Sequence, residues 1–182
     1  MGDVKGIAPK TLVVNLYSGP GAGKSTTMAG VFHALKCLDV NCEMGHEFAK
    51  EKVWDESYAV LRDQIYVFAK QLHSLRRLDG KVDVIVTDSP LLLSLIYGKA
   101  EPVEFRDLVC RMNSGFRSVD FLLRRHKKFN HIGRIHTLEQ SAEIDEEIAG
   151  LLRCHGIKHE VIDADVNAVS TIIKKVMKEL GK

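Results

Sequence analysis

The sequence predicts a single α/β domain in which helices cover both faces of a five-stranded parallel sheet. The chain has 182 residues, of which 45% are hydrophobic and 27% charged, and these values suit one soluble globular domain over residues 1–182. Short runs rich in β-branched residues alternate with longer segments of helical periodicity, a pattern typical of βαβ units. One run, Val82–Thr87, is almost continuously apolar, as a strand covered on both faces requires.

Five short runs are expected as strands because apolar and β-branched residues dominate them. Segments with helical periodicity separate these runs, so the strands are expected to lie parallel in one sheet. The expected strands are Thr11–Tyr17, Asn41–His46, Val82–Thr87, Val119–Leu123 and Glu160–Ile162.

The segments between and after these runs carry apolar residues at helical spacing. Pro102 stands near the first turn of one segment, Thr137 or Ser141 can cap the start of another, and Gly156 ends it. Residues 51–78 keep the helical spacing throughout and are expected to form one long helix. The expected helices are Lys24–Leu38, Glu51–Leu78, Pro102–Asn113, Thr137–Cys154 and Val166–Leu180.

A glycine-rich loop, Ser18–Thr26, joins the first expected strand to the first expected helix. Small residues let the backbone curl so that successive N–H groups point at phosphate oxygens, and the helix adds the positive end of its dipole. Lys24 is expected to act in catalysis at the β- and γ-phosphates, and the Ser25 hydroxyl is expected to coordinate Mg²⁺. This context predicts a P-loop NTPase fold that binds ATP. The expected ATP-binding residues of the loop are Gly19, Gly21, Ala22, Gly23, Lys24, Ser25 and Thr26.

The loop departs from the pattern GxxxxGK[ST] at one position, because Ser18 stands where the first glycine is expected. Serine is small, and Gly19 and Gly21 are expected to supply flexibility beside it. A chance glycine-rich turn is the alternative, but it does not account for the strand before the loop and the helix after it. A phosphate loop by itself leaves the reaction open.

The third expected strand ends in a carboxylate, Asp88. Binding residues of parallel sheets gather at the carboxyl ends of the strands, so Asp88 is expected beside the phosphate loop. There it would coordinate Mg²⁺ together with Ser25 and take part in catalysis. The alternative is a capping role in the turn that Ser89 and Pro90 continue.

A second carboxylate is expected across the cleft from the γ-phosphate, after the second strand. Glu47 is the candidate general base or ligand of the acceptor hydroxyl, and an ordinary carboxylate suffices because the proton leaves late in a loose transition state. Glu43 is the competitor, since one residue of register decides which side chain faces the cleft. Either residue could instead be a solvated loop acid.

Cationic side chains are concentrated in residues 124–136. One interpretation is a lid whose arginines close over ATP, with Arg125 binding the cofactor and Arg134 and Arg124 acting in catalysis. A second interpretation is a patch that grips an anionic acceptor such as DNA. A solvated charge run is the remaining alternative.

No segment indicates a membrane or secreted protein. Residues 1–10 lack the apolar core of a signal peptide, and the longest apolar runs are far too short to span a bilayer. The four cysteines show no CxxC spacing and are expected as reduced thiols, so a cytoplasmic location is expected. The net charge of +2 is too small to indicate nucleic-acid binding by itself.

Five stretches carry a resemblance that covers most of the chain: Ser18–Thr26, Glu47–Lys50, Gln64–Phe68, Thr87–Pro90 and Gly133–Arg134. Together they resemble the small P-loop kinases of the nucleoside and nucleotide kinase group. In particular, they resemble virus-encoded kinases that phosphorylate 5-hydroxymethyluracil in DNA. The resemblance implies a five-stranded parallel core, ATP with Mg²⁺ as phosphoryl donor, and a basic lid.

The resemblance also implies transfer of the γ-phosphoryl group to a hydroxyl. The first choice of acceptor is the 5-hydroxymethyl group in DNA, a step of thymidine hypermodification in the cytoplasm of a bacterium infected by a virus. A kinase for a free nucleoside, a deoxynucleoside monophosphate or nicotinamide riboside is the alternative within the group. A non-kinase NTPase switch is the alternative from another class, since a phosphate loop does not fix the chemistry. The oligomeric state stays open.

Overall fold

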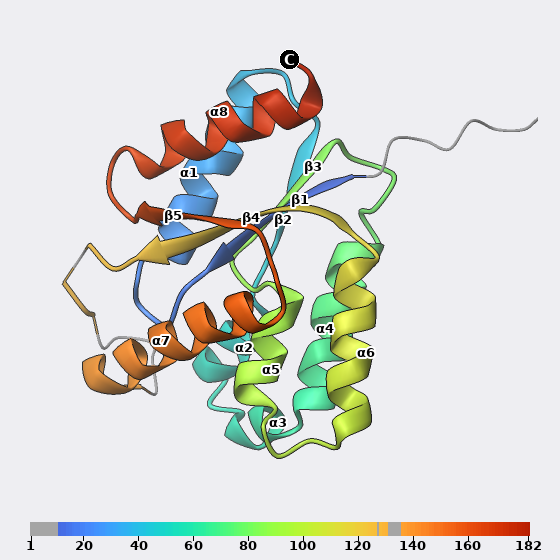
Figure 1. Ribbon diagram of the computed structural model, residues 1–182, viewed down its shortest axis with the longest axis vertical. Helices are drawn as coiled ribbons and strands as arrows, with labels where there is room; N and C mark the ends of the chain where they lie inside the picture. The colour runs from blue at the N-terminus through green and yellow to red at the C-terminus, as the bar shows by residue number, and fades with distance from the viewer. Residues whose placement is uncertain (1–10, 127, 131–135) are drawn as a thin grey trace, which may run out of the picture.

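The computed structural model of the chain describes residues 11–126, 128–130 and 136–182. Its strands form one parallel five-stranded sheet in the order β2-β3-β1-β4-β5 (Figure 1), which confirms the predicted α/β class. The strands are β1 (Leu12–Tyr17), β2 (Cys42–Gly45), β3 (Val84–Thr87), β4 (Arg117–Arg124) and β5 (His159–Asp163).

The strand order puts β1 at the centre of the sheet, between β3 and β4. Asn15 of β1 is in register with Thr87 on one side and with Asp120 on the other. The carboxyl ends of β1 and β3 therefore reach the same edge of the sheet. The phosphate loop, which follows Tyr17, and Asp88, which follows β3, leave this edge as neighbours, as expected for a parallel sheet.

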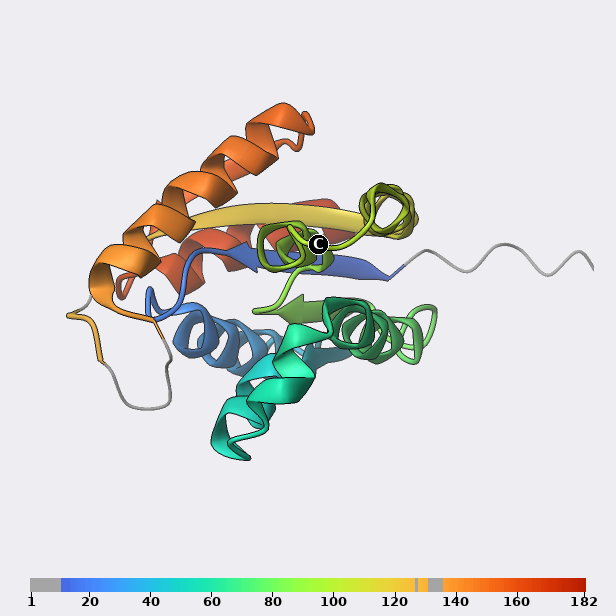
Figure 2. The ribbon, with the colours of Figure 1, turned by 90° about the horizontal axis from the view of Figure 1, so that it is seen from below.

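Helices cover both faces of the sheet (Figures 1 and 2). Leu12, Val14 and Leu16 pack in a core cluster with α1 and α8, whereas Val13 and Tyr17 pack in a second cluster with α4, α6 and α7. Alternate residues of β1 thus serve opposite faces, which is why the strand is apolar at nearly every position. The helices are α1 (Lys24–Cys37), α2 (Phe48–Trp54), α3 (Tyr58–Arg62), α4 (Gln64–Arg76), the 3-10 helix η1 (Leu91–Leu93), α5 (Ser94–Tyr97), α6 (Val103–Ser114), α7 (Leu138–Cys154) and α8 (Ala168–Leu180).

The prediction of one long helix over residues 51–78 is wrong. Three helices, α2, α3 and α4, occupy this region, and the first begins at Phe48. Glu56 has a left-handed backbone with φ of 52°, and Asp63 caps α4 by accepting a hydrogen bond from the Tyr66 N–H. The apolar spacing runs across both breaks because all three helices contribute side chains to the wall of one cavity. The break before α4 arises because aspartate favours helix starts over helix interiors.

Helix α7 begins with a capping box. The Thr137 hydroxyl accepts a hydrogen bond from the Gln140 N–H, and the Gln140 side chain accepts one from the Thr137 N–H, so two N–H groups at the helix start are satisfied. Ser141, the other candidate cap, has a different role, because its hydroxyl donates a hydrogen bond of 2.6 Å to the Pro20 carbonyl. The start of α7 is therefore attached to the phosphate loop.

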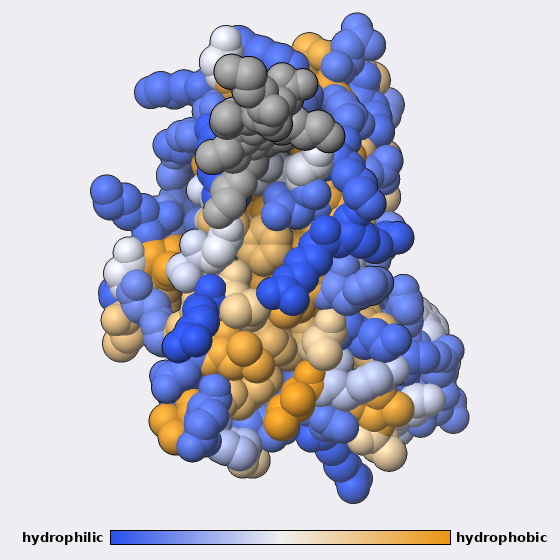
Figure 3. Space-filling model, turned by 90° about the vertical axis from the view of Figure 1, so that its right-hand side faces the viewer, coloured by the Kyte–Doolittle hydropathy of each residue, from blue (hydrophilic) through white to orange (hydrophobic). Residues whose placement is uncertain are grey.

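Figure 3 shows the side of the molecule that α4 and α6 form, and apolar side chains gather over its lower half. Ile65 on α4 and Leu108 on α6 are both exposed. These helices bury one apolar stripe in the core and leave part of another at the surface. None of the helices in the described part of the chain combines the length and apolar character needed to cross a membrane.

Candidate functional site

The phosphate loop turns between β1 and α1 through two glycines with a left-handed backbone. Gly21 has φ of 76° and Gly23 has φ of 115°, a region that favours glycine over other residues. Gly23 is also closely packed, since an added Cβ would lie 3.2 Å from the Cβ of Ala164. Helix α1 begins at Lys24, so the positive end of its dipole faces the loop.

The Lys24 side chain is turned back onto the loop. Its Nζ donates hydrogen bonds to the carbonyl oxygens of Ser18 at 2.6 Å and Gly19 at 3.1 Å. Burial lowers the pKa of Lys24, and nearby carboxylates, including Glu47 and Asp88, act against that lowering. A phosphate can replace the two carbonyls because an ammonium group bonds more strongly to an anionic partner.

Ser25 and Asp88 form the pair expected at a magnesium site. The Ser25 hydroxyl donates a hydrogen bond of 2.6 Å to Asp88 Oδ2. The other carboxylate oxygen, Oδ1, is buried and lacks a hydrogen-bond partner among the described residues. A hydroxyl and a carboxylate oxygen are hard ligands that suit Mg²⁺, so Ser25 and Asp88 would fit this ion. Across the described residues there is no group of three or more His, Cys, Asp or Glu able to hold a metal ion.

A cavity of about 550 Å³ lies against the phosphate loop. The loop and the start of α1 form part of its wall, and α2, α3, α4 and α5 contribute further side chains. These include two amides, Gln64 and Gln71, and two aromatic side chains, Trp54 and Tyr97. Its volume falls in the range of small-molecule sites.

Glu47 and Lys50, at the start of α2, both line this cavity. They also line a neighbouring cavity of about 180 Å³ together with Ser25 and Asp88. The Lys50 Nζ lies 3.5 Å from the Ser25 Oγ. One carboxylate and one ammonium group from α2 thus lie beside the pair that is expected to hold magnesium.

Gln71 presents an oriented amide to the cavity wall. Its side chain is buried, and Nε2 donates a hydrogen bond of 3.4 Å to the Thr87 hydroxyl. The Thr87 hydroxyl donates its own proton to the Gly45 carbonyl at 2.9 Å, so it acts as an acceptor toward Gln71. This arrangement directs Nε2, and not Oε1, toward Thr87, and it therefore fixes the orientation of the Gln71 side-chain amide.

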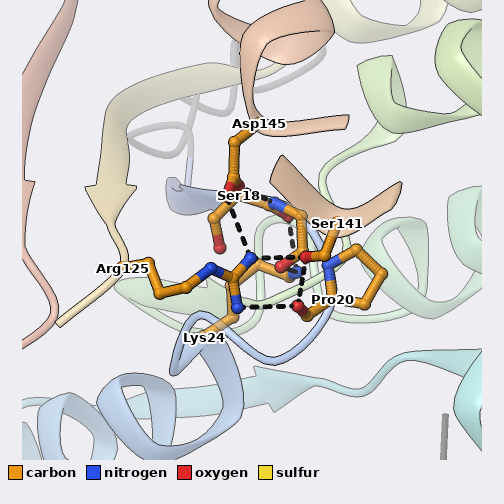
Figure 4. A network of polar contacts seen from close by, with 7 residues as sticks. Ser18, Pro20, Lys24, Arg125, Ser141 and Asp145 are labelled. Atoms are coloured by element: carbon orange, nitrogen blue, oxygen red, sulfur yellow. Dashed lines mark hydrogen bonds and ion pairs between the residues drawn. The ribbon is translucent and has the colours of Figure 1, made fainter. Parts of the chain in front are cut away.

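Arg125 is folded against the phosphate loop (Figure 4). Its guanidinium donates hydrogen bonds to the Pro20 carbonyl at 3.1 Å and to the Ser141 hydroxyl, and it pairs with Asp145 at 2.9 Å. Asp145 Oδ1 also accepts a hydrogen bond of 2.5 Å from the Gly19 N–H. Arg125, which the sequence predicts to bind the cofactor, thus lies beside the phosphate loop.

Arg124 does not join this group. It is exposed and pairs with Asp163 of β5 at 2.9 Å, and it is not among the residues that line the two cavities. The geometry therefore gives no support to a catalytic role for Arg124, because the neighbouring strand holds its guanidinium. Arg134, the other catalytic candidate from the basic segment, lies outside the described residues.

Glu43 and Glu47, the two candidate acids in and after the second expected strand, lie in different surroundings. Glu43 of β2 lies 3.7 Å from Lys36 in an ion pair near the surface, whereas Glu47 lines both cavities. Of these two acids, Glu47 is the one at the cavity walls.

The predicted loop residues separate into three groups. Gly19 faces α7 and Ala22 is fully buried, while the others line the larger cavity: Gly21, Gly23, Lys24, Ser25 and Thr26.

Several residues at the site were not predicted from the sequence. Lys50 stands three residues after Glu47 in the stretch Glu47–Lys50, and this spacing is a sequence signal that places both side chains near one end of a helix. Gln71, Ser141 and Asp145 carry no local motif, because only tertiary packing brings them to the site.

Comparison with known proteins identifies the family. A family model described as an AAA domain matches residues 13–168, so the chain belongs to this family. Among solved structures, the chain is similar to one titled "Crystal structure of NadR protein in complex with NR", with a TM-score of 0.69 and 16% sequence identity. The alignment covers 94% of this chain and 50% of the NadR chain, so this chain spans about half the length of that protein. No curated protein gives a sequence match.

Proposed function

We propose that the chain is an ATP-dependent kinase that transfers the γ-phosphoryl group to a hydroxyl of a nucleoside-sized acceptor. The observation that carries this proposal is the shared cavity, which both the phosphate loop and the side chains of α2–α5 line. A donor phosphate on the loop and an acceptor against these helices would therefore lie in one cavity. Such an arrangement suits direct transfer between two bound molecules.

Each residue has a defined task in this proposal. Lys24 moves from the loop carbonyls to the β- and γ-phosphates, and Mg²⁺, held by Ser25 and Asp88, neutralises phosphate charge when bound. The acceptor oxygen forms a bond to the γ-phosphorus as the bond to the β,γ-bridging oxygen breaks. Glu47 takes the hydroxyl proton, and ADP leaves. Lys50 is close enough to this centre to stabilise the charge on the transferring group.

The lining of the cavity supports a planar, hydrogen-bonding acceptor. The amides of Gln64 and Gln71 can pair with the edge of a heterocycle, and Trp54 and Tyr97 offer aromatic surface beside them. A free nucleoside is our first candidate. The NadR protein to which this fold is similar was solved in complex with NR, so nicotinamide riboside belongs among the acceptors to be tested.

The 5-hydroxymethyl group of 5-hydroxymethyluracil in DNA is the second candidate, supported by the resemblance of the motifs. Its base would have to flip out of the duplex to enter the cavity. We rank it second because the first two arginines of the basic segment have intramolecular partners. Arg124 pairs with Asp163, and Arg125 with Asp145, so these side chains are less available for a DNA backbone.

The test is transfer of labelled γ-phosphate from MgATP to a panel of acceptors. The panel holds free deoxynucleosides, deoxynucleoside monophosphates, nicotinamide riboside, ordinary DNA and DNA that contains 5-hydroxymethyluracil. Label on a nucleoside is the expected result, and Lys24→Ala should abolish it. Label only on the hydroxymethylated DNA would reverse the order of the two candidates. ATP hydrolysis at a rate that no acceptor changes would refute the kinase proposal and favour an NTPase switch.

A further inference from the structure

A polar network joins helix α7 to the donor side of the site (Figure 4). Asp145 is its central residue, because one carboxylate oxygen accepts from the Gly19 N–H at 2.5 Å and the other pairs with Arg125 at 2.9 Å. Ser141, one helical turn earlier, donates to the Pro20 carbonyl at 2.6 Å and accepts from Arg125. Two successive residues of the phosphate loop and one arginine are thus attached to a single helix face.

This network differs from an ordinary surface ion pair. The side chains of Arg125 and Asp145 are only 16% and 26% exposed, so solvent screens their interaction less than it screens an exposed pair. The backbones are also in close contact, because a Cβ added to Gly19 would lie 2.5 Å from the Ser141 carbonyl oxygen. At Gly19, the loop and α7 therefore leave no room for a side chain.

We propose that Asp145 is a positioning residue for the donor nucleotide, which holds the entrance of the phosphate loop and Arg125 in the arrangement that receives the triphosphate. This inference rests on the proposed function only in taking a nucleotide as the ligand of the loop. Asp145 satisfies the N–H of Gly19 from outside the loop. The N–H groups further along, from Gly21 onward, stay available to phosphate, as the motif expects.

The charges explain why Asp145 and Arg125 must act together. A carboxylate beside a phosphate-binding loop repels the ligand unless a cation compensates it, and Arg125 supplies that cation. Removal of Arg125 alone leaves the Asp145 charge uncompensated near the phosphates. Removal of both charges eliminates this repulsion, so the effects of the two substitutions on nucleotide affinity should not be independent.

A double-mutant cycle measured by MgADP titration tests this inference. Arg125→Ala should weaken ADP binding about tenfold and Asp145→Asn about threefold, whereas the double variant should be no weaker than Arg125→Ala alone. Glu147→Gln is the matched control, because Glu147 lies on the same helix in an exposed pair with Lys99 and should leave ADP affinity unchanged. Asp145→Ala, which removes both contacts, provides a second measurement and should weaken binding more than Asp145→Asn.

A thirtyfold loss in the double variant, the product of the two single effects, would overturn the inference, as would an Asp145→Asn variant with wild-type ADP affinity. A purely structural role would lower the unfolding temperatures of the Asp145 variants without changing their ADP affinity. The titration needs no acceptor, so failure of the acceptor panel would leave this cycle interpretable. Conversely, failure of the cycle would leave the kinase proposal intact.

Discussion

Replacement of Gly19 by alanine tests the packing between the phosphate loop and α7. An ideal Cβ on Gly19 would lie 2.5 Å from the Ser141 carbonyl oxygen and 3.0 Å from both Asp145 Oδ1 and Ser141 Oγ. The two side-chain oxygens can rotate away, but the carbonyl belongs to the first turn of α7 and cannot. To reach a carbon–oxygen distance of about 3.3 Å, the loop and the helix must separate by about 0.8 Å, the difference from the 2.5 Å contact.

This separation has two costs. Overpacking against a rigid neighbour costs about 1 to 3 kcal/mol, and weakening the hydrogen bond from the Gly19 N–H to the Asp145 carboxylate adds about 1 kcal/mol. The free energy of unfolding should therefore fall by about 2 to 4 kcal/mol. For a chain of this length, that loss corresponds to a decrease of roughly 5 to 15 °C in the unfolding temperature.

The assay is thermal unfolding without nucleotide, with Gly150→Ala as the matched control. Gly150 lies inside α7, and an added Cβ there meets no atom within 4 Å. Alanine should therefore stabilise this position by about 0.5 to 1 kcal/mol through its higher helix propensity. The two glycine substitutions should shift the unfolding temperature in opposite directions. If Gly19→Ala unfolds at or above the wild-type temperature, the close approach of α7 to the loop is refuted.

Three further substitutions test individual tasks at the site. Asp88→Asn should lower kcat at least about 100-fold with a much smaller change in ATP affinity, and an unchanged rate in steady-state assays would return Asp88 to a capping role. Lys50→Met should lower kcat about tenfold or more. Lys52→Met is the control on the same helix, because Lys52 pairs with Asp55, and its kcat should match that of the wild type. Equal effects of the two substitutions on kcat would argue against a specific role for Lys50. Gln71→Leu should raise the KM of the acceptor about tenfold and leave the KM of ATP unchanged, and the opposite pattern would exclude Gln71 from the acceptor site.

The sheet could be predicted from the sequence because each strand is a local pattern. Apolar and β-branched residues dominate Val82–Thr87 and Thr11–Tyr17, and the strands observed there, β3 and β1, lie within these bounds. The prediction of a single helix over residues 51–78 was wrong because apolar spacing indicates which side chains face the interior. It does not indicate whether the helical backbone is continuous. The turn at Glu56 and the cap at Asp63 break the helix without breaking the spacing.

The donor and acceptor sides of the proposed site also differ in how far the sequence predicts their residues. The placement of Lys24, Ser25 and Asp88 at one edge of the sheet follows from a motif and from the rule that strand ends gather at that edge. Gln71 could not be identified, because its role depends on Thr87, whose hydroxyl orients the amide from another element of the fold. The contact between Gln71 of α4 and Thr87 of β3 can be identified only from the three-dimensional structure.

Gly19 shows how one residue type can have two physical explanations. The sequence suggested that Gly19 and Gly21 both give the loop flexibility, and Gly21 indeed has the left-handed backbone that favours glycine. Gly19 is not among the described residues with positive φ. Glycine is required there because α7 leaves no room for a Cβ. Small size at this position therefore reflects the docking of a helix more than a hundred residues later in the chain, and the same helix carries Asp145, the residue that we propose positions the donor nucleotide.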